Sequence, residues 1–243
     1  MAGSVTSVYG RFPAPVVSVR LMPTGYRSWT QDGPVAFGRI RRGENVRIDL
    51  YADVERPLPD FYGDWTATHE FSHLLLPRLH SGHRWLAEGF ASYYQNVLMA
   101  RSGRYTPQYA LHMLTAGFGR GRASRPDLSP NEAARAGLRT ARYKIYWSGA
   151  AFFLLADVEL RKRSGGRESL DTVLDRLGQC CLPTSRRWSG ETLLSRLDSF
   201  LDEPLFEPLY ERVADSPGFP DTAPALAEQG IIDAIFAVRT STH

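Results

Sequence analysis

The stretch HEFSHLLLPRLHSGHRWLAEGFASYYQ, residues 69 to 95, decides how the rest of this chain is interpreted. His69 and His73 are four residues apart, and side chains with this spacing lie on the same face of an α-helix. Their two imidazoles can therefore reach a single point. Glu70 lies about 100° further around the helix, so its carboxylate reaches a neighbouring position instead. This HExxH pattern is typical of zinc sites in which two histidines bind the metal and the glutamate acts as a base toward water.

A catalytic zinc site needs a third protein ligand, and Glu88 is the candidate, 88 − 73 = 15 residues after the second histidine. Pro77 ends the first helix, and the residues that follow provide a turn through which a second helix returns antiparallel to the first. HExxH has only three fixed positions and also arises by chance. On the pattern alone, two interpretations of His69 and His73 have equal weight: they are zinc ligands, or they are ordinary surface or core histidines.

The remaining histidines of this region are interpreted as structural. His80 and His83 lie in the turn and are predicted to be solvated. His112 lies on a helix face and is predicted to be a packed or capping residue, with an approach to the cleft as the alternative.

Composition and charge exclude several classes of protein. With 243 residues and 43% hydrophobic residues, the chain is long enough to bury a substantial core as one large domain or two small ones. Its net charge of +3, from 29 basic and 26 acidic residues, is too balanced to predict a nucleic-acid or anionic-membrane partner. Only two basic residues are lysines, so 29 − 2 = 27 are arginines. Because these arginines are scattered along the sequence, they carry no functional prediction.

Cysteines and apolar runs also bear on where and how the chain folds. Cys180 and Cys181 are adjacent, and because neighbouring residues rarely reach disulfide geometry, they are predicted to be half-buried thiols. The most apolar stretch, at 149–160, is short and carries two acidic residues, which predicts a core helix and no membrane-spanning segment. The first residues lack the pattern of a signal peptide. We therefore expect a cytoplasmic location by default, or a periplasmic or secreted one if the chain is part of a longer protein.

The pattern of residues changes from strand to helix near residue 62. Residues 1–62 contain VVSVRLMP, PVAFGRI and NVRIDLYADV, which are rich in β-branched and apolar residues, with RRGEN at 41–45 as a turn. Residues 63–243 are predicted to be the helical part that carries the zinc site, within one catalytic domain overall. Strands followed by helices indicate an α+β fold with a small N-terminal sheet portion.

Capping and stop signals place the helices. Asp64 is the expected N-cap of the first helix, Thr106 with Pro107 begins another, and Ser129 with Glu132 matches a capping box. Further helices are predicted at 85–101, 143–163, 169–177 and within 190–214. The stretch GFGRGRASRPDLSP, at 117–130, is predicted to be a mobile basic loop.

The segment WLAEGFASYY, residues 85–94, carries a family resemblance together with HEFSH. It resembles the gluzincin metallopeptidases, namely the aminopeptidase N family and, more closely, the glycyl aminopeptidase family, which carry Trp-x-x-Glu-Gly-Phe-Ala/Thr-Ser-Tyr after HExxH. The resemblance implies a mostly helical, thermolysin-like zinc peptidase catalytic domain that binds one zinc ion per chain. It further implies that His69, His73 and Glu88 are the zinc ligands and that Glu70 is the general base.

A second segment, YWSGAAFFLLADVELRKRSGGRESLDTVLDRL at 146–177, is similar to the glycyl aminopeptidase pattern Tyr-x-Lys-Gly-Ala followed by an apolar helix, Gly-Gly and Ser-Leu-Asp. In these families the tyrosine hydrogen-bonds to the tetrahedral intermediate, and here it corresponds to Tyr146. A core tyrosine is the alternative role for Tyr146, and Tyr143 is the alternative residue.

Three departures separate this chain from the families it resembles. Ser148 replaces the lysine of Tyr-x-Lys-Gly-Ala, and the interval from His73 to Glu88 is four residues shorter than in the aminopeptidase N family. Neither Gly-x-Met-Glu-Asn nor Gly-Gly-Leu-Glu-His, whose glutamate holds the free amine of the substrate, is present. Gly43-Glu44-Asn45 matches part of the first motif, but it fits a hairpin turn better. Glu44 is therefore a weak candidate for binding the amine, and the substrate-binding residues stay unknown.

The resulting prediction is a zinc-dependent, aminopeptidase-like hydrolase whose partner is a peptide or protein substrate. Glu70 takes a proton from water and passes it to the leaving amine, while Tyr146 stabilises the oxyanion. Ser92 and Glu159 are candidates for orienting the imidazoles, with an exposed ion pair to an arginine as the alternative for Glu159. The competing functions are an endopeptidase or oligopeptidase with the same site, a catalytically inactive zinc- or peptide-binding domain, and a metal-free helical protein. The oligomeric state stays open.

Overall fold

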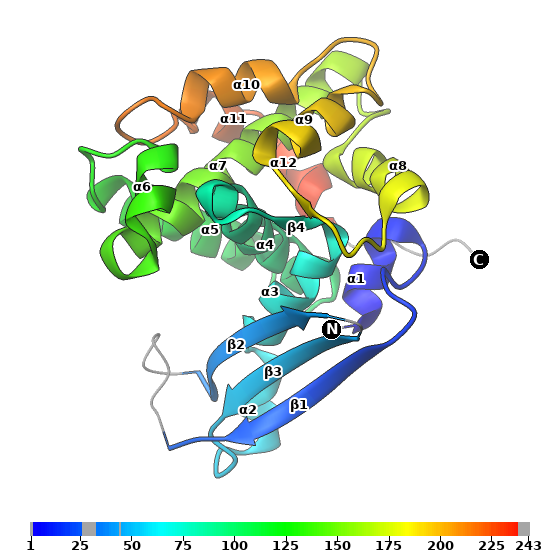
Figure 1. The fold of residues 1–243 in the computed structure, drawn as a ribbon, viewed down its shortest axis with the longest axis vertical. Helices are drawn as coiled ribbons and strands as arrows, with labels where there is room; N and C mark the ends of the chain where they lie inside the picture. Colours follow the sequence, from blue (N-terminus) through cyan, green and yellow to red (C-terminus); the bar gives the residue numbers. More distant parts are fainter. Residues whose placement is uncertain (1, 26–32, 44, 238–243) are drawn as a thin grey trace.

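The structure, a computed structural model, describes residues 2–25, 33–43 and 45–237. A small sheet lies beneath a larger group of helices (Figure 1). In chain order the elements are α1 (Ala2–Tyr9), β1 (Val17–Pro23), β2 (Val35–Arg42), β3 (Val46–Ala52), α2 (Leu58–Tyr62), α3 (Thr66–Ser72), η1 (His73–Leu75), β4 (Arg78–Leu79), η2 (Ser81–His83), α4 (Arg84–Arg101), α5 (Pro107–Ala123), α6 (Pro130–Ala136), α7 (Leu138–Ser164), α8 (Leu170–Cys181), β5 (Arg187–Trp188), α9 (Gly190–Asp198), α10 (Phe206–Val213), α11 (Ala223–Leu226) and α12 (Gln229–Phe236). The α+β class predicted from the sequence is confirmed.

The sheet has the strand order β1-β3-β2, with β3 parallel to β1 and antiparallel to β2. Strand β2 is therefore an edge of this sheet. Ile48, Leu50 and Ala52 alternate along β3 and are buried, because alternate residues of a strand face the same side. Helix α3 packs against β2 and β3. The edge strand β2 and the helix with the HExxH pattern are thus held side by side.

The helical core is built around α4 and α7, which pack against each other more extensively than any other pair of elements in the described ranges. They approach closely at two glycines: a Cβ atom placed on Gly149 would lie 2.0 Å from the carbonyl oxygen of Trp85 and 2.7 Å from Cα of Gly89. The predicted helix at 143–163 is confirmed and begins earlier, with a kink at Ala141. No helix in the described part of the chain is long and apolar enough to span a membrane.

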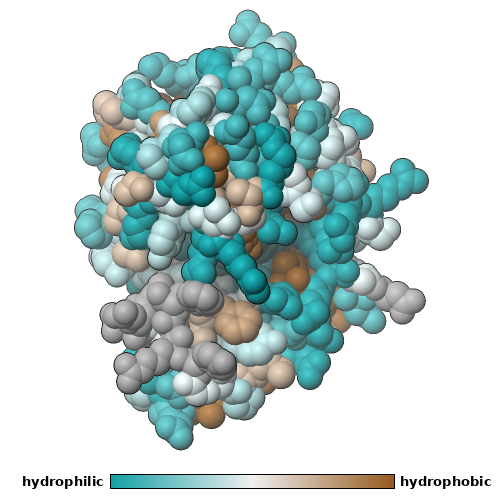
Figure 2. Space-filling view, turned by 60° about the vertical axis from the view of Figure 1, so that its left-hand side comes forward, coloured by the Kyte–Doolittle hydropathy of each residue, from teal (hydrophilic) through white to brown (hydrophobic). Residues whose placement is uncertain are grey.

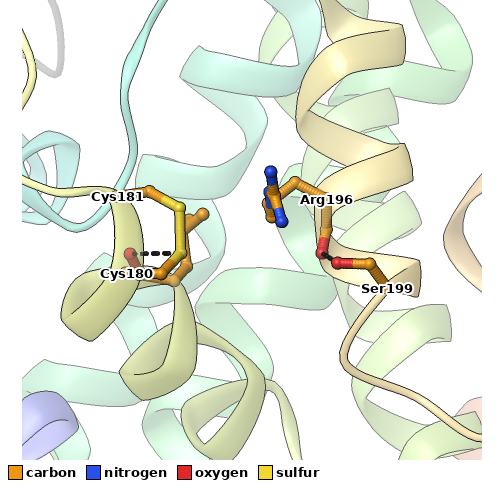
Figure 3. Close-up of a disulfide and its surroundings, with 5 residues drawn as sticks. Cys180, Cys181, Arg196 and Ser199 are labelled. Atoms are coloured by element: carbon orange, nitrogen blue, oxygen red, sulfur yellow. Dashed lines mark hydrogen bonds between the residues drawn. A yellow bond between two sulfur atoms is a disulfide. The ribbon is translucent and has the colours of Figure 1, made fainter.

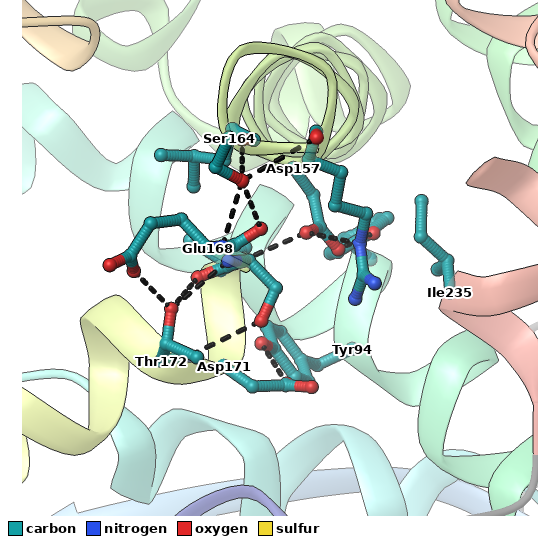
Figure 4. A network of polar contacts seen from close by, with 12 residues as sticks. Tyr94, Asp157, Ser164, Glu168, Asp171, Thr172 and Ile235 are labelled. Carbon is teal, nitrogen blue, oxygen red and sulfur yellow. Dashed lines mark hydrogen bonds and ion pairs between the residues drawn. The ribbon is translucent and has the colours of Figure 1, made fainter. Parts of the chain in front are cut away.

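A buried polar network joins α4 to the helices that surround it (Figure 4). The hydroxyl of Tyr94 donates to Asp171 and that of Tyr93 to Asp157, both at 2.7 Å. Asp171 also forms an ion pair with Arg101 at 2.8 Å, and both side chains are almost completely buried. Because α4, α7 and α8 each contribute a charged or phenolic group, this network fixes the three helices relative to one another.

Two of the three predicted helix caps are confirmed. Ser129 and Glu132 form the predicted capping box of α6, and the hydroxyl of Thr106 accepts a hydrogen bond from the backbone of Tyr109 at the start of α5. The predicted N-cap Asp64 is one residue too early, because Trp65 is the N-cap of α3 and makes no side-chain cap hydrogen bond. Asp64 instead accepts hydrogen bonds from the backbone nitrogens of Thr66 and of Val35 in the sheet. Local hydrogen bonds between side chain and backbone are therefore the part of the helix pattern that the sequence specifies most directly.

Two predictions about local structure were wrong. The region 117–130 is not all loop, because α5 continues to Ala123 with Phe118 and Gly121 buried. A Cβ atom on Gly117 would lie 2.2 Å from the Trp147 ring, so the glycines of this helix allow close packing on α7. The strand-like start of the chain contains helix α1, which buries Val5 and Tyr9 against the rest of the molecule.

The prediction of free cysteines was also wrong. Cys180 and Cys181, at the end of α8, are joined in a disulfide, with their Cα atoms 3.7 Å apart (Figure 3). Cys180 Sγ lies 3.6 Å from the carbonyl oxygen of Leu177. The helix ends at Cys181, so the disulfide lies at its C-terminal end. The next residue, Leu182, has an extended backbone conformation.

Candidate metal centre

Helix α3 and the short η1 that follows present the HExxH residues. His69 and Glu70 lie within α3 and are buried, and His73 begins η1, where it is partly buried. Arg42, at the end of β2, holds the end of this segment in place. Its guanidinium donates hydrogen bonds to the carbonyl oxygens of His73 and Leu76. Burial and the nearby charge of Arg78 lower the pKa of Arg42 to about 10, so it remains protonated at neutral pH.

Glu88 comes from α4 and lies between the two histidines. Its Oε2 is 3.4 Å from Nε2 of His69 and 3.6 Å from Nε2 of His73. One ligand atom from each of the three residues lies within 4.8 Å of the others. Two imidazole nitrogens and one carboxylate oxygen that converge in this way fit the ligand set of a catalytic zinc site. The residues present therefore suit the metal that the sequence pattern predicts.

In the protein without metal, the negative charge of Glu88 and a positive charge on His69 stabilise each other. Burial alone would raise the pKa of Glu88, but hydrogen bonds from His69 and His73 outweigh it and hold the pKa well below its usual range. Burial would lower the pKa of His69, yet the contact with Glu88 and the charge of Glu70 raise it. Glu88 is therefore ionised, and the imidazole of His69 next to it favours a positive charge.

Gln95 orients His69, and sequence reasoning did not identify it. Oε1 of Gln95 lies 2.8 Å from Nδ1 of His69, so the amide accepts the proton of Nδ1 and leaves Nε2 free to bind metal. Gln95 is seven residues after Glu88, which is two helical turns and the same face of α4. This spacing is the signal in the sequence from which it could have been found.

The two residues predicted for this orienting role do not fill it. The hydroxyl of Ser92 donates to the backbone carbonyl of Glu88 at 2.8 Å, within α4. Glu159 pairs with Arg163 at 2.7 Å on an exposed face of α7, as its alternative interpretation held. Both side chains contact a partner one turn away in their own helix, because residues four apart are neighbours on the helix surface.

Tyr146 of α7 lies against the centre. Its ring stacks on that of His69, with 5.7 Å between centroids and 13° between planes. Burial, then the charges of Glu88 and Glu70, raise the pKa of Tyr146 well above its usual value, so the phenol stays protonated and able to donate a hydrogen bond. Tyr143, its alternative, is 46% exposed. Ser148 is fully buried, and its hydroxyl has no hydrogen-bond partner in the part of the chain that the structure describes.

A cleft of about 650 Å³ opens beside these residues, lined in part by Glu70, His73, Glu88 and Tyr146. Strand β2 forms one wall. Gly38 of that strand lies so close to the base that a Cβ atom there would be 2.4 Å from Cγ of Glu70. On the face drawn in Figure 2, hydrophilic side chains border a hollow between the helices and the sheet. Four of the predicted residues thus line one cavity, and the fifth, His69, is buried in contact with Glu88 and Tyr146.

The other candidate residues lie apart from the centre. His80 is exposed at the rim of the cleft, and His83 forms an ion-pair contact with Glu191 at 2.9 Å, so only His80 is solvated as predicted. His112 is exposed on α5 and stacks beside Tyr109, not at the cleft. Glu44, the candidate for binding a substrate amine, lies outside the described residues.

Comparison with known proteins finds one family model that matches part of the chain. A family model described as M61 glycyl aminopeptidase matches residues 77–145, a stretch that includes Glu88 but neither the two histidines nor Tyr146. A search of curated proteins finds no match. The resemblance to gluzincin aminopeptidases inferred from the sequence agrees with the family match and with the structures found.

Solved structures share the fold. An aminopeptidase N family protein from Idiomarina loihiensis matches with a TM-score of 0.69 and 16% identity, over 92% of this chain and 42% of that one. A mutant M1 zinc metallopeptidase from Deinococcus radiodurans, bound to a Tyr-Ser-Ala substrate, matches with a TM-score of 0.59 and 18% identity, over 90% and 44%. The chain thus spans less than half the length of the structures it matches.

Proposed function

We propose that this chain carries the active site of a zinc-dependent peptidase. The observation that supports the proposal is the convergence of His69, His73 and Glu88, with Glu70 and Tyr146 beside them, on one cleft. The family match and the zinc metallopeptidase with the same fold point to the same chemistry. A catalytically inactive zinc-binding domain would have no use for a base and a phenol at this position.

Zinc held by the three ligands supplies Lewis acidity at the cleft and makes water easier to deprotonate. Glu70 accepts a proton from the attacking water as its oxygen bonds to the peptide carbonyl carbon. The phenol of Tyr146 donates a hydrogen bond to the oxyanion that this attack produces. Glu70 then delivers its proton to the amide nitrogen, the C–N bond breaks, and an amine and a carboxylic acid form, whose remaining acidic proton passes to the amine or to water.

Elemental analysis of the purified protein tests the metal part of this proposal. We expect one zinc per chain in the wild type and loss of zinc in both His69→Ala and Glu88→Ala, because each removes one of three ligands. Ser92→Ala is the matched control on α4, since its hydroxyl bonds only to the helix backbone. Retention of zinc without Glu88 would rule out this ligand set.

Kinetics of two further variants tests the assigned roles. Glu70→Gln should keep zinc and lose almost all peptide hydrolysis, because an amide cannot accept the proton. Tyr146→Phe should lower kcat by about 10²- to 10³-fold, the usual cost of one oxyanion donor. Wild-type rates in metal-replete Glu70→Gln would contradict the mechanism.

Whether the enzyme is an aminopeptidase is a separate part of the proposal. Among the described residues that line the cleft, the only carboxylates are Glu70 and Glu88, and both already have roles. The remaining candidate for holding a free α-amine, Glu44, lies outside the described residues. The family match favours aminopeptidase-like activity, with endopeptidase or oligopeptidase activity as the alternative. Cleavage of matched peptides with a free or an acetylated N-terminus separates the two. Equal cleavage supports the endopeptidase, and loss on acetylation supports the aminopeptidase.

A further inference from the structure

The cleft gathers arginines that the sequence shows only as scattered residues. Among its described lining residues are two carboxylates, Glu70 and Glu88, and six arginines from β2, β4, α4 and β5: Arg39, Arg41, Arg42, Arg78, Arg84 and Arg187. A net charge of +3 for the whole chain gives no hint of this concentration. Positive charge that lines a concave site attracts anionic ligands more strongly than the same charge on a flat surface.

Two of these arginines are engaged within the protein. Arg41 forms an ion pair with Asp49 at 2.8 Å, and Arg42 donates to backbone carbonyls next to the metal ligands. The other four have no ion pair with any carboxylate in the ranges 2–25, 33–43 and 45–237. Their charges face the cleft without a described counter-charge.

Arg78 and Arg187 are held next to each other by the backbone. They are directly paired in the short parallel ladder of β4 and β5, and both are exposed. Like charges opposite each other on neighbouring strands destabilise the pairing. An anion bound between the two guanidinium groups removes that repulsion and accepts paired hydrogen bonds from them. The short ladder therefore has the composition of an anion-binding site.

This pair lines the same cavity as the reacting groups. Arg78 is five residues after His73, beyond the turn at Pro77, and it lines the same cavity as Glu70 and Tyr146. Arg84 is one helical turn before Glu88 on α4, so it lies on the same face of that helix. An anion at these arginines therefore occupies the same cleft as a peptide bond placed at the metal centre.

We propose that the cleft selects anionic peptides, with Arg78 and Arg187 binding a substrate carboxylate beside the scissile bond. This inference rests on the proposed peptidase function and names its substrate class. The carboxylate belongs either to an Asp or Glu side chain or to the C-terminus of the peptide. The same charges repel a free amine bound next to them.

Binding is measured with a matched set of fluorescent peptides that carry Glu, Gln or Lys at the positions on both sides of a central bond. Each is made with a free and with an amidated C-terminus. Anisotropy titrations use zinc-replete Glu70→Gln, so that binding is read without cleavage. Arg78→Gln, Arg187→Gln and the double substitution are added to this background. The control is Arg167→Gln, an exposed arginine in the turn after α7, outside the cleft.

We expect Glu peptides to bind about tenfold or more tightly than Gln peptides, which corresponds to about 1.4 kcal/mol. The double substitution should abolish that ratio, Arg187→Glu should move the preference toward Lys, and the Arg167 control should leave it intact. If the affinity depends instead on the free C-terminus, amidation will remove it and Glu→Gln will not. Equal binding of all peptides, or a Glu preference that survives the double substitution, would overturn the inference.

The two proposals fail in different ways. If wild-type protein hydrolyses no peptide but binds acidic ones through Arg78 and Arg187, the peptidase assignment is wrong and the anionic ligand class stands. If it hydrolyses peptides regardless of their charge, the peptidase assignment stands and the inference about substrate class is wrong. Circular dichroism of each variant confirms that changes in binding do not come from unfolding.

Discussion

At the scale of single residues, a glycine on the edge strand determines where Glu70, the proposed catalytic base, can lie. Gly38 of β2 faces the side chain of Glu70, and a Cβ atom there would come within 2.4 Å of Cγ and 3.0 Å of Cδ. Glu70 is buried within α3, so its side chain has little room to retreat. The position of the carboxylate thus depends on the absence of a side chain on the neighbouring strand.

Gly38→Ala should therefore displace the base and leave the metal ligands in place. A displacement of about 1 Å at a reacting group costs on the order of 100-fold in rate, so we expect a fall of that size in kcat/KM with one zinc retained per chain. Gly43→Ala, in the turn after the same strand, is the control, because no atom lies within 4 Å of its added Cβ. Equal rates for the two variants would show that Gly38 does not position Glu70.

Residues of the site were predictable where helical periodicity or a motif fixes them. His69, His73 and Glu88 converge as the spacing predicted, and Tyr146 lies beside them. The arginine pair was not predictable, because it depends on two short strands more than 100 residues apart in the sequence pairing in one register. Sequence spacing reveals contacts within one element, whereas pairing between distant elements requires the fold.

At the scale of secondary-structure elements, the crossing of α4 and α7 sets the distance between Glu88 and Tyr146. Gly89 follows the ligand directly, and Gly149 lies three residues after the tyrosine. Each would place a Cβ atom against the backbone of the other helix. Since the obstacle is backbone and not a flexible side chain, neither helix can adjust without moving as a whole.

Gly149→Ala should separate the two helices and disturb stability and catalysis together. Overpacking of a core costs about 1 to 3 kcal/mol, and we expect the free energy of unfolding to fall by that amount. Urea denaturation measures the loss, and kcat reports the shift of Tyr146. Gly119→Ala on α5 is the control: its Cβ meets nothing within 4 Å, so alanine should stabilise that helix by up to about 1 kcal/mol. A stable and active Gly149→Ala would contradict the close crossing.

Errors in predicting elements arose where tertiary packing outweighs local preference. Glycines at 117, 119 and 121 suggest a loop, yet two of them are required in α5 because Trp147 and Phe219 occupy the space of a side chain. The β-branched start of the chain suggests a strand, but the spacing of Val5, Val8 and Tyr9 buries one face of a helix. In both segments the burial of one face was the stronger determinant.

At the scale of the whole molecule, the buried pair of Arg101 and Asp171 joins the helices that carry the site to those that support them. The guanidinium also donates to the carbonyl oxygen of Ile235 in α12, and Asp171 accepts from Tyr94. Burial would lower the pKa of Arg101, but the charge of Asp171 raises it, so the guanidinium stays protonated. Such a pair is costly to bury and becomes more costly when one partner is removed.

Asp171→Asn keeps the shape of the side chain and leaves the Arg101 charge buried without a carboxylate partner. We expect the free energy of unfolding to fall by about 3 to 5 kcal/mol, the usual cost of breaking a buried pair. Natural domains are stable by only about 5 to 15 kcal/mol, so the variant should unfold at much lower urea concentration. Asp175→Asn, on the same helix but bonded to exposed Gln179, should change stability by less than about 0.5 kcal/mol. Zinc bound per folded chain should be the same in both variants, because neither residue contacts His69, His73 or Glu88. Equal stability of the two variants would show that the network does not hold the helices together, and loss of zinc from folded Asp171→Asn would show that the metal centre depends on it.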